Sequence, residues 1–436
     1  MMPGENFIKN FEELATTPQR HDTLMIAQAG LEAIDTVRVL KQEVYFKGNT
    51  LCVGDTVCAL EAPERIFFIG VGKCASASAA AIEEILGGRL TKGVVLDVEQ
   101  MKASPYASDK ITYYAGTHPL PSQKNVEATK HILDMLVGLT PRDLVIMLIS
   151  GGGSTLLCQP PEGMGCSDEA AIFKELTSRG ATIQALNTVR KHLSYARGGN
   201  LVRAAYPAQV IGLIFSDVPG NSMGFIASGP TVRDTTTIND AEAVLARYGV
   251  VHDHVPFIET PKEEAYFEHV QNILLVNNMR ALRAMKEYAE GLGYSARIVT
   301  DEITGEARSV AQRIASELHA APRGTVLLYG GETTVTVINP ARGNGGRNQE
   351  LAIAALQYVM EGEVIMSFDS DGRDNNDSAG AIADVNTTSH AERKHVSIDE
   401  ALHTHASHAF FEEVGDVVMT GATGSNVSDL IIALKN

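Results

Sequence analysis

The stretch "LVIMLISGGGSTLL" (residues 144–157) is the clearest indication of the fold in the sequence. An uninterrupted apolar run is followed by Ser150, three glycines and Ser154. A short run that is apolar throughout predicts a parallel strand buried on both faces. The glycines weaken any helix or strand, so the chain is expected to leave the strand in a loop. Ligands bind at the carboxyl ends of the strands in open α/β sheets, and the stretch therefore predicts a ligand-facing loop in an α/β fold.

Similar apolar runs alternate with helical patterns on both sides of this strand. Strands are expected at 65–72, 93–98, 144–150 and 209–218, and helices at 73–87, 126–137 and 168–185. Such alternation predicts βαβ units with right-handed crossovers. We therefore expect a large domain over residues 1–235, built as a Rossmann-like, doubly wound parallel sheet.

The alternation breaks up after this domain and then resumes. Residues 236–270 contain two prolines within a stretch of no clean period, which indicates a hinge region. Beyond it we expect strands at 272–277, 295–300, 363–372 and 416–421, a hairpin at 325–338, and helices at 305–318 and 346–359. This pattern predicts a second, smaller α/β domain over residues 236–436, hinge included.

Composition restricts the partners and the compartment. The chain has 36 Lys and Arg residues against 53 Asp and Glu residues, a net charge of −17, and no basic block. This balance argues against nucleic acid and against an anionic membrane as partners. No signal peptide or bilayer-spanning run is visible. The five cysteines form no CxxC pair, which predicts free thiols in a reducing cytoplasm. A homodimer is left open.

The first loop that could bind a ligand or take part in a reaction is "GVGKCA" (residues 70–75). Gly70 and Gly72 fit the pattern G-x-G-x-x-A, and Asp97 ends the next strand. This is a dinucleotide-binding fingerprint, with the acid placed for a ribose hydroxyl, although a plain tight turn would look the same. Lys73 adds a full positive charge where a helix N-terminus already favours anions, which suits a phosphate or a carboxylate better than a neutral ring.

The second loop is the glycine run that follows the apolar strand. Gly151, Gly152 and Gly153 allow several backbone N–H groups to converge on one anion, and Ser150 and Ser154 add hydroxyl donors. A crowded packing corner is the alternative, and we favour an anion site.

A third group of polar residues lies in "LNTVRKHLSYARGGN" (residues 186–200) and "FSDVPG" (residues 215–220). Asn187 and Arg190 are candidates for substrate binding, although a solvated basic helix with a glycine stop explains the same residues. Asp217 follows a strand, so it is a helix cap, a base or a metal ligand.

The fourth group is the pair "RGNGGRNQE" (residues 342–350) and "FDSDGRDNND" (residues 368–377). Arg347 follows a glycine loop and begins a helix. Asp369, Asp371 and Asp374 crowd a strand exit, and clustered carboxylates repel unless a cation lies among them. Because hard cations prefer oxygen ligands, the cluster is either a Mg²⁺ site or a solvated turn.

Anion loops, cationic side chains and an acidic cluster are what phosphoryl transfer needs. The motifs "ISGGGSTLL", "NTVRKHLSYARGGNL", "FSDVPGNSMGFIASGPT", "YGGETTVTV", "GNGGRNQELAIA", "SDGRDNNDSAGA" and "GATGSNVSDLII" resemble the glycerate 2-kinase family, also called type II glycerate kinases or the MOFRL family. The resemblance runs from about residue 5 to the C-terminus.

The resemblance implies ATP- and Mg²⁺-dependent phosphorylation of D-glycerate at its 2-hydroxyl, which gives 2-phosphoglycerate and ADP. It places the site in a cleft between the two domains, with Lys73 and Arg347 as catalytic residues. We add Asp217, at the end of its strand, as a third catalytic candidate. Mg²⁺ is expected at Asp369, Asp371 and Asp374. Contacts to substrate or phosphate are expected from Gly70, Gly72, Ser150, Gly151, Gly152, Gly153, Ser154, Asn187, Arg190, Gly330, Gly331, Glu332 and Thr333.

Two other functions stay open. Some family members carry the name hydroxypyruvate reductase, which the "GVGKCA" fingerprint would also suggest, with NAD(P) as cofactor and His118 as the candidate near a nicotinamide. A reductase would not require the motif "GGRNQE" or the aspartate cluster, so that function leaves both unexplained. A non-catalytic anion-binding protein would not need Lys73 and the acids together.

Overall fold

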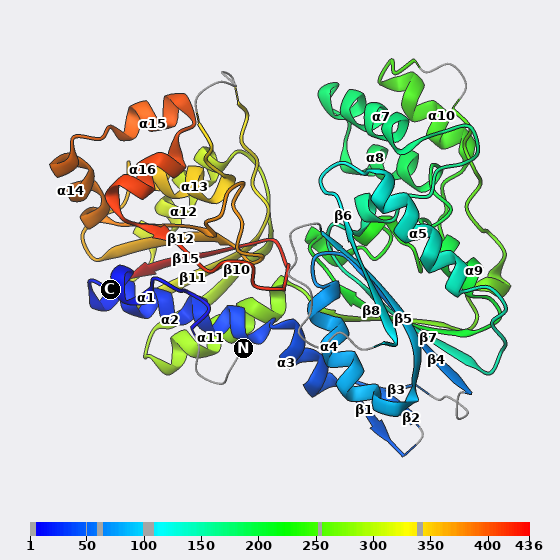
Figure 1. Cartoon of the computed structure of the whole chain (residues 1–436). Coiled ribbons are helices and arrows are strands. Elements are labelled where there is room, and N and C mark those ends of the chain that lie inside the picture. The colour runs from blue at the N-terminus through cyan, green and yellow to red at the C-terminus, as the bar shows by residue number, and fades with distance from the viewer. Residues whose placement is uncertain (1–5, 49, 59–63, 99–108, 252–254, 338–342) are drawn as a thin grey trace. The chain divides into compact units, whose positions relative to one another are not determined.

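The computed structural model describes residues 6–48, 50–58, 64–98, 109–251, 255–337 and 343–436. It divides the chain into two compact units (Figure 1). We call Thr36–Val276 the parallel-sheet unit. The other unit combines Met1–Asp35 with Asn277–Asn436, and we call it the mixed-sheet unit.

The parallel-sheet unit is built on six strands in the order β6-β5-β4-β7-β8-β9. They are β4 (Arg65–Val71), β5 (Leu90–Val98), β6 (Ile111–Gly116), β7 (Asp143–Ile149), β8 (Gln209–Phe215) and β9 (Val270–Val276). Every neighbouring pair is parallel. Counted from β4, the order is that of a doubly wound dinucleotide-binding sheet. The predicted parallel sheet is thus confirmed, and all seven residues of β7 are buried, as its apolar run indicates.

Helices cover both faces of this sheet. Phe67, Ile69 and Val71 pack in one core with residues of α5 and α9. Gly70 points the other way, toward α4, where a Cβ on it would lie 3.4 Å from the Cβ of Ala75. Successive strand residues face opposite sides, so α4 and α5 lie on different faces. The helices of the unit are α3 (Thr36–Glu43), α4 (Ala75–Leu86), α5 (Gln123–Met135), α6 (Gly153–Leu156), α7 (Cys166–Ser178), α8 (Ile183–Lys191), α9 (Asn200–Ala205) and α10 (Ile238–Arg247). A small antiparallel sheet in the same unit consists of β1 (Val44–Lys47), β2 (Thr50–Val53) and β3 (Thr56–Cys58).

The mixed-sheet unit has a six-stranded sheet in the order β10-β11-β15-β12-β13-β14. Its strands are β10 (Ser295–Ile303), β11 (Thr325–Gly331), β12 (Glu363–Asp369), β13 (Gly380–Ala383), β14 (Val417–Val418) and β15 (Asp429–Lys435). Only β10 and β11 are parallel neighbours among these strands, and the other neighbouring pairs are antiparallel. The second α/β unit is therefore present, with a mixed sheet.

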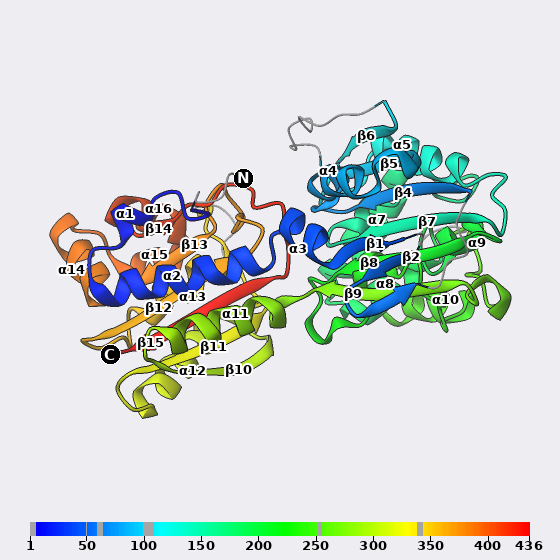
Figure 2. The same ribbon diagram turned by 90° about the horizontal axis from the view of Figure 1, so that it is seen from below.

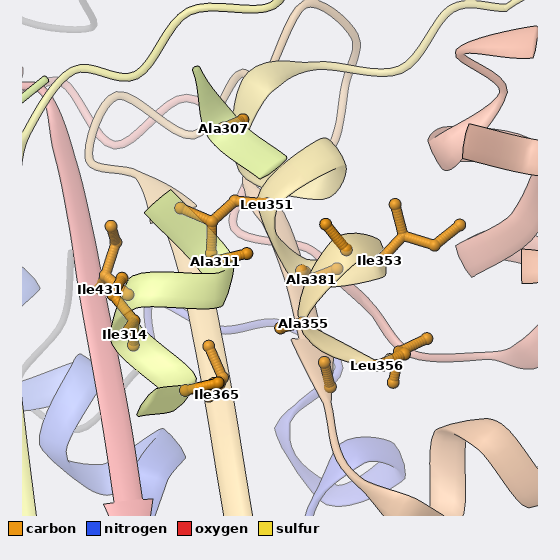
Figure 3. Close-up of a cluster of buried hydrophobic side chains, with 14 of the residues drawn as sticks. Ala307, Ala311, Ile314, Leu351, Ile353, Ala355, Leu356, Ile365, Ala381 and Ile431 are labelled. Carbon is orange, nitrogen blue, oxygen red and sulfur yellow. The ribbon is translucent and has the colours of Figure 1, made fainter. Parts of the chain in front are cut away.

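Two helices from distant parts of the chain lie side by side on one face of this sheet (Figure 2). They are α2 (Pro18–Ala33) and α11 (Asn278–Gly291). Their approach depends on Gly30, where a Cβ would lie only 2.7 Å from the Cγ of Met285. The other face is covered by α12 (Ala307–Ala320) and α13 (Arg347–Ala355), with α14 (Val385–Lys394), α15 (Ile398–Thr404) and α16 (Ser407–Val414) beyond them. Alanine and leucine side chains of α12 and α13 form a dense core with Ile365 and Ile431 of the sheet (Figure 3).

The predicted domain boundary at 235/236 differs from the division that the structure shows. The run expected at 272–277 to open the second domain is β9, which pairs with β8 as the sixth strand of the first sheet. The N-terminal segment, expected in the first domain, supplies α2 to the mixed-sheet unit. An apolar pattern predicts that a strand or helix forms, but not which sheet it joins.

The predicted hairpin at 325–338 is wrong for the residues that the structure describes; residue 338 lies outside them. Only β11 forms there, and its antiparallel neighbour is β15, about a hundred residues further along the chain. The apolar run "DLIIALK", which became β15, was expected only as part of a motif. Across the described residues, no helix combines the length and the apolar character that a bilayer crossing requires.

A buried ion-pair cluster fixes the N-terminal segment in the mixed-sheet unit. The guanidinium of Arg20 is fully buried and donates from Nε and Nη2 to Asp384, 2.7 Å in each case, and from Nη1 to Asp416 at 2.5 Å. Asp384 also accepts from the backbone amide of Thr387 at the start of α14. Burial opposes the charge on Asp384, but pairing with Arg20 holds the pKa of that carboxyl below its ordinary value.

We expect Arg20→Ala to lower the free energy of unfolding of the mixed-sheet unit by about 3–5 kcal/mol, because it leaves two buried carboxylates uncompensated. Urea unfolding followed by circular dichroism measures the loss. The matched control is Arg142→Ala, which removes an exposed pair with Glu64 and should change little. Equal effects of the two substitutions would contradict the assignment.

Candidate functional site

Two loops meet where the strand order of the parallel sheet reverses. The loop after β4 and the loop after β7 leave neighbouring strands, and this position is where open α/β sheets bind ligands. The amide of Ser150 donates to the carbonyl of Val71, and the amide of Lys73 donates to the carbonyl of Gly151, each at 2.9 Å. The two predicted glycine loops are therefore bonded to each other.

Gly72 is required by this contact. Its φ is +115°, and a Cβ on it would lie 2.2 Å from Oγ of Ser150 and 2.8 Å from the carbonyl oxygen of Gly151. Ser150 is fully buried. Its hydroxyl accepts from the amide of Cys74 at 3.2 Å and donates to the carbonyl of Val71 at 3.3 Å. Ser150 thus joins the loops, and its hydroxyl, predicted to bind a ligand, is hydrogen-bonded within the protein.

Gly152 lies close to the side chains of Lys73 and His118. It has a left-handed backbone, with φ +83°. A Cβ there would lie 3.4 Å from Cγ of Lys73 and 3.6 Å from Cδ2 of His118. Within the described ranges, the backbone amides of Gly151 and Gly152 have no hydrogen-bond acceptor in the protein. Two successive amides beside a lysine are the elements of an anion site.

A chain of hydroxyls links the glycine loop to α8. Oγ of Ser154 lies 2.9 Å from Oγ of Ser228, which donates to Oδ1 of Asn187 at 2.8 Å. Gly153 packs against Ala227, whose Cβ would lie 2.6 Å from a Cβ on the glycine. The structure thus links the predicted Ser154 and Asn187 through Ser228. Ser228 belongs to the motif "ASGPT" but was not among the predicted site residues.

Arg190 stands on the same helix, one turn from Asn187. Its guanidinium lies over the ring of Phe173, 4.2 Å from the centroid. Its Nε is buried and has no acceptor among the described residues. The neighbouring Arg197 forms an ion pair with Glu169, with 2.7 Å between Nη1 and Oε1. Burial, with the charge of Arg197 in addition, lowers the pKa of Arg190 to about 10, so the position favours a bound anion.

The two strand-end aspartates of this unit differ in role. Asp97 is buried and accepts from the amide of Ser76 at 2.8 Å. It therefore caps α4, and burial raises the pKa of its carboxyl. Asp217 follows β8 at the same edge and is partly exposed. Burial, with Asp97 and Asp217 adding to it, raises the pKa of the Cys74 thiol to about 12, so Cys74 stays a neutral thiol between them.

In the mixed-sheet unit, Arg347 begins α13 and is held by carboxylates. Its Nε and Nη2 donate to Asp429 at 2.8 and 2.9 Å, and Nη2 also donates to Asp369 at 2.7 Å. Nη1 lies 3.5 Å from Glu332. Burial disfavours the charge, but the three carboxylates outweigh it and raise the pKa of Arg347 above its ordinary value. Asp429, which begins β15, had been overlooked within the motif "SNVSDLII".

The structure does not gather the carboxylates of Asp369, Asp371 and Asp374, where Mg²⁺ was predicted, into one group. Asp374 is buried and accepts from the backbone amides of Asn348 at 3.0 Å and Gln349 at 2.8 Å. Asp369 pairs with Arg347, and the carboxylate of Asp371 accepts from the amide of Arg373. No group of three His, Cys, Asp or Glu side chains in the described part of the chain is placed to hold a metal. The charge of the aspartates is balanced by a helix N-terminus and by Arg347, so these residues do not fit a resident cation.

The loop after β11 contains the last predicted contacts. Gly331 has φ +140°, and a Cβ on it would lie 2.4 Å from the backbone of Ile303. Gly330 similarly abuts Asn278, so both glycines serve packing. Glu332 lies beside Arg347, and the buried hydroxyl of Thr333 has no partner among the described residues. Glu332 and Thr333 are thus the members of this group that could meet a ligand.

Two family models match the chain. The domain of unknown function DUF4147 matches residues 22–259, and the MOFRL family matches residues 325–429. The D-glycerate 2-kinase of Thermotoga maritima is 34% identical over 385 residues, which cover 85% of this chain and 91% of that protein. The chain belongs to the glycerate 2-kinase family. The resemblance inferred from the motifs is thereby confirmed.

The fold comparison agrees with this membership. The crystal structure of a glycerate kinase from Thermotoga maritima superposes with a TM-score of 0.83 at 31% identity and covers 95% of this chain and 99% of that one. A protein of Agrobacterium vitis named putative hydroxypyruvate reductase is 37% identical, over 84% of this chain and 86% of that protein. Relatives within the family thus carry both names.

We expect Gly72→Ala to abolish activity and to lower stability by about 2 kcal/mol or more, because the new Cβ meets backbone and hydroxyl oxygens at an unfavourable φ. The control is Gly88→Ala, where a Cβ would meet no atom within 4 Å. Thermal unfolding and a phosphoryl-transfer assay on both variants give the answer. A stable, active Gly72→Ala enzyme would show that the two loops can separate without loss.

Proposed function

We propose that the protein transfers the γ-phosphoryl group of ATP to glycerate. The observation that carries the proposal is the pair of unbonded amides at Gly151 and Gly152 beside Lys73, at the reversal point of the parallel sheet. Fixed N–H groups and a cation are what a transferring phosphoryl group requires. The near full-length similarity to a D-glycerate 2-kinase supports the same reaction.

The name of that relative also suggests the finer chemistry. We propose D-glycerate as the acceptor, its 2-hydroxyl as the attacking group, and 2-phosphoglycerate and ADP as the products. The free thiols Cys52, Cys74, Cys158 and Cys166 support the cytoplasm as the compartment. Only small-molecule partners are needed for this reaction.

We assign roles to the predicted residues as follows. Lys73 and the amides of Gly151 and Gly152 stabilise charge on the transferred group. Asn187 and Arg190 bind the anionic substrate, since the buried Nε of Arg190 has no acceptor among the described residues and Glu169 pairs with Arg197.

Arg347 neutralises charge at a phosphate group, with Asp369 and Asp429 fixing the plane of its guanidinium. Nη1, which lies toward Glu332, is the nitrogen left to turn to a ligand. Asp217 contacts a hydroxyl of the substrate from the exit of β8.

Magnesium enters the proposal only with the nucleotide. The aspartates that were expected to hold it are engaged by backbone amides and by Arg347. A magnesium requirement would therefore follow the concentration of ATP rather than that of a site on the protein.

The alternative function, an NAD(P)-dependent reductase, lacks an available acid for the ribose of its cofactor. An NAD(P) enzyme with this sheet would need Asp97 to accept from a ribose hydroxyl. That carboxylate is buried and caps α4 instead.

Incubation with D-glycerate and Mg-ATP should yield 2-phosphoglycerate, and a phosphorus NMR spectrum separates it from the 3-phospho isomer. Hydroxypyruvate with NADH, and with NADPH, should give no change in absorbance. A dominant 3-phospho product would refute the acceptor position, and reduction of hydroxypyruvate would refute the kinase assignment.

Lys73→Ala and Arg347→Ala should each lower kcat by about 10²-fold or more, as loss of a fixed charge-stabilising donor does. Lys73→Arg should not restore the rate, because a broad guanidinium does not replace a compact ammonium at a tight turn. Lys92→Ala and Arg323→Ala, at exposed positions of the respective units, serve as controls. Either assignment fails if its alanine variant, shown folded by circular dichroism, turns over at the wild-type rate.

A further inference from the structure

His118 lies at the glycine loop with its ring edge turned to Gly152. A Cβ on Gly152 would lie 3.6 Å from Cδ2 and 3.8 Å from Nε2 of this ring, and 3.4 Å from Cγ of Lys73. The exposed His118 comes from the loop after β6, whereas Lys73 comes from the loop after β4. Three segments of the chain thus bring the side chain of Lys73 and the imidazole of His118 to one glycine.

The loop that carries His118 is tied to the glycine loop by hydrogen bonds on both sides of the histidine. Asn125 accepts from the amide of Thr117 at 2.9 Å and donates to the carbonyls of Thr117 and Thr155 at 3.0 and 3.2 Å. The hydroxyl of Thr155 donates to the carbonyl of Pro119 at 3.2 Å. The position of the ring relative to Gly152 is therefore fixed by the fold and does not depend on the imidazole alone.

Phosphorylation of a hydroxyl releases a proton, and a positioned base that accepts it accelerates the reaction. Three other groups near this edge, Asp97, Cys74 and Lys73, do not suit that task. Asp97 is engaged as the cap of α4, and Cys74 is a neutral thiol of high pKa. Lys73 is a cation. An imidazole ionises near neutral pH and exchanges protons readily with solvent.

We infer that His118 accepts the proton of the glycerate hydroxyl; the inference rests on the proposed function. The hydroxyl oxygen forms a bond to the γ-phosphorus while the bond from that phosphorus to the ADP oxygen breaks, and ADP leaves with the electron pair. The hydroxyl proton passes to Nε2 of His118 and from there to solvent, to which the residue is exposed. Lys73 stays charged and faces the phosphoryl group.

The side chain of Lys73 contacts the same glycine as the ring of His118. The glycine loop from Ser150 to Thr155 contains no titratable side chain, and neither do the adjacent Thr117 and Pro119. A base must be unprotonated to act, so the rate should fall as the pH drops below the ionisation of this ring.

His118→Gln should lower kcat by about 10²-fold, the usual contribution of a general base, and leave the KM for ATP within about twofold. The acidic limb of the kcat/KM profile for glycerate should disappear. In His118→Ala, added imidazole should restore part of the rate, because the site is open to solvent. The control is His131→Gln, an exposed histidine of α5 that stacks on Tyr114 and should retain full activity with an unchanged pH profile.

Three outcomes would overturn the assignment. The first is a His118→Gln enzyme with a near wild-type kcat. The second is an acidic limb that persists in His118→Gln and vanishes in Asp217→Asn, which would make Asp217 the base. The third is a raised KM for ATP with an intact acidic limb, which would make the ring a phosphate ligand. His118→Asn repeats each test if the glutamine variant does not fold. Absence of glycerate phosphorylation in the wild-type protein would instead refute the proposed function.

Discussion

The contact between the loops after β4 and β7 is the constraint on which the rest of the site depends. Gly72 approaches Ser150 and Gly151 so closely that no side chain fits between them. The amides of Gly151 and Gly152 have no acceptor in the described part of the chain, and the side chains of Lys73 and His118 both lie close to Gly152. A backbone closed in this way needs no reorganisation when an anion arrives, and preorganised donors stabilise transition states best.

Anion binding by a chain with a net charge of −17 requires that positive charge be supplied locally. In the parallel-sheet unit the sources are backbone amides, Lys73, and Arg190, whose neighbour Arg197 takes the nearby carboxylate. In the mixed-sheet unit Arg347 is surrounded by carboxylates. Those partners fix the direction of its guanidinium and keep it charged, but they also compete with any phosphate. Arg347 therefore offers a planar guanidinium of fixed orientation, whereas Lys73 offers a compact positive charge.

Most of the parallel sheet could be predicted from its sequence, because strands buried on both faces are apolar throughout. The loops after β4 and β7 were equally visible, since glycines mark sites where backbones approach closely. The sequence did not indicate which strands pair with each other. The residues of the run 272–277 do not indicate that β9 pairs with β8. The pairing of β11 with the distant β15 depends on packing across the whole sheet, which a local pattern does not contain. Likewise, the polar residues were found, but not the atoms that each one would contact.

The aspartates show why residue type and spacing cannot settle a site. Asp97 stands where a dinucleotide fingerprint places its acid, and Asp374 stands in a cluster that suggests a cation. Both carboxylates accept backbone amides at the first turn of a helix. A helix N-terminus carries partial positive charge and unbonded N–H groups, so it satisfies a carboxylate as a ribose hydroxyl or a magnesium ion would. Because the carboxylates of Asp97 and Asp374 are already bonded to the amides of α4 and α13, the function that we propose relies on other groups, those at the glycine loop.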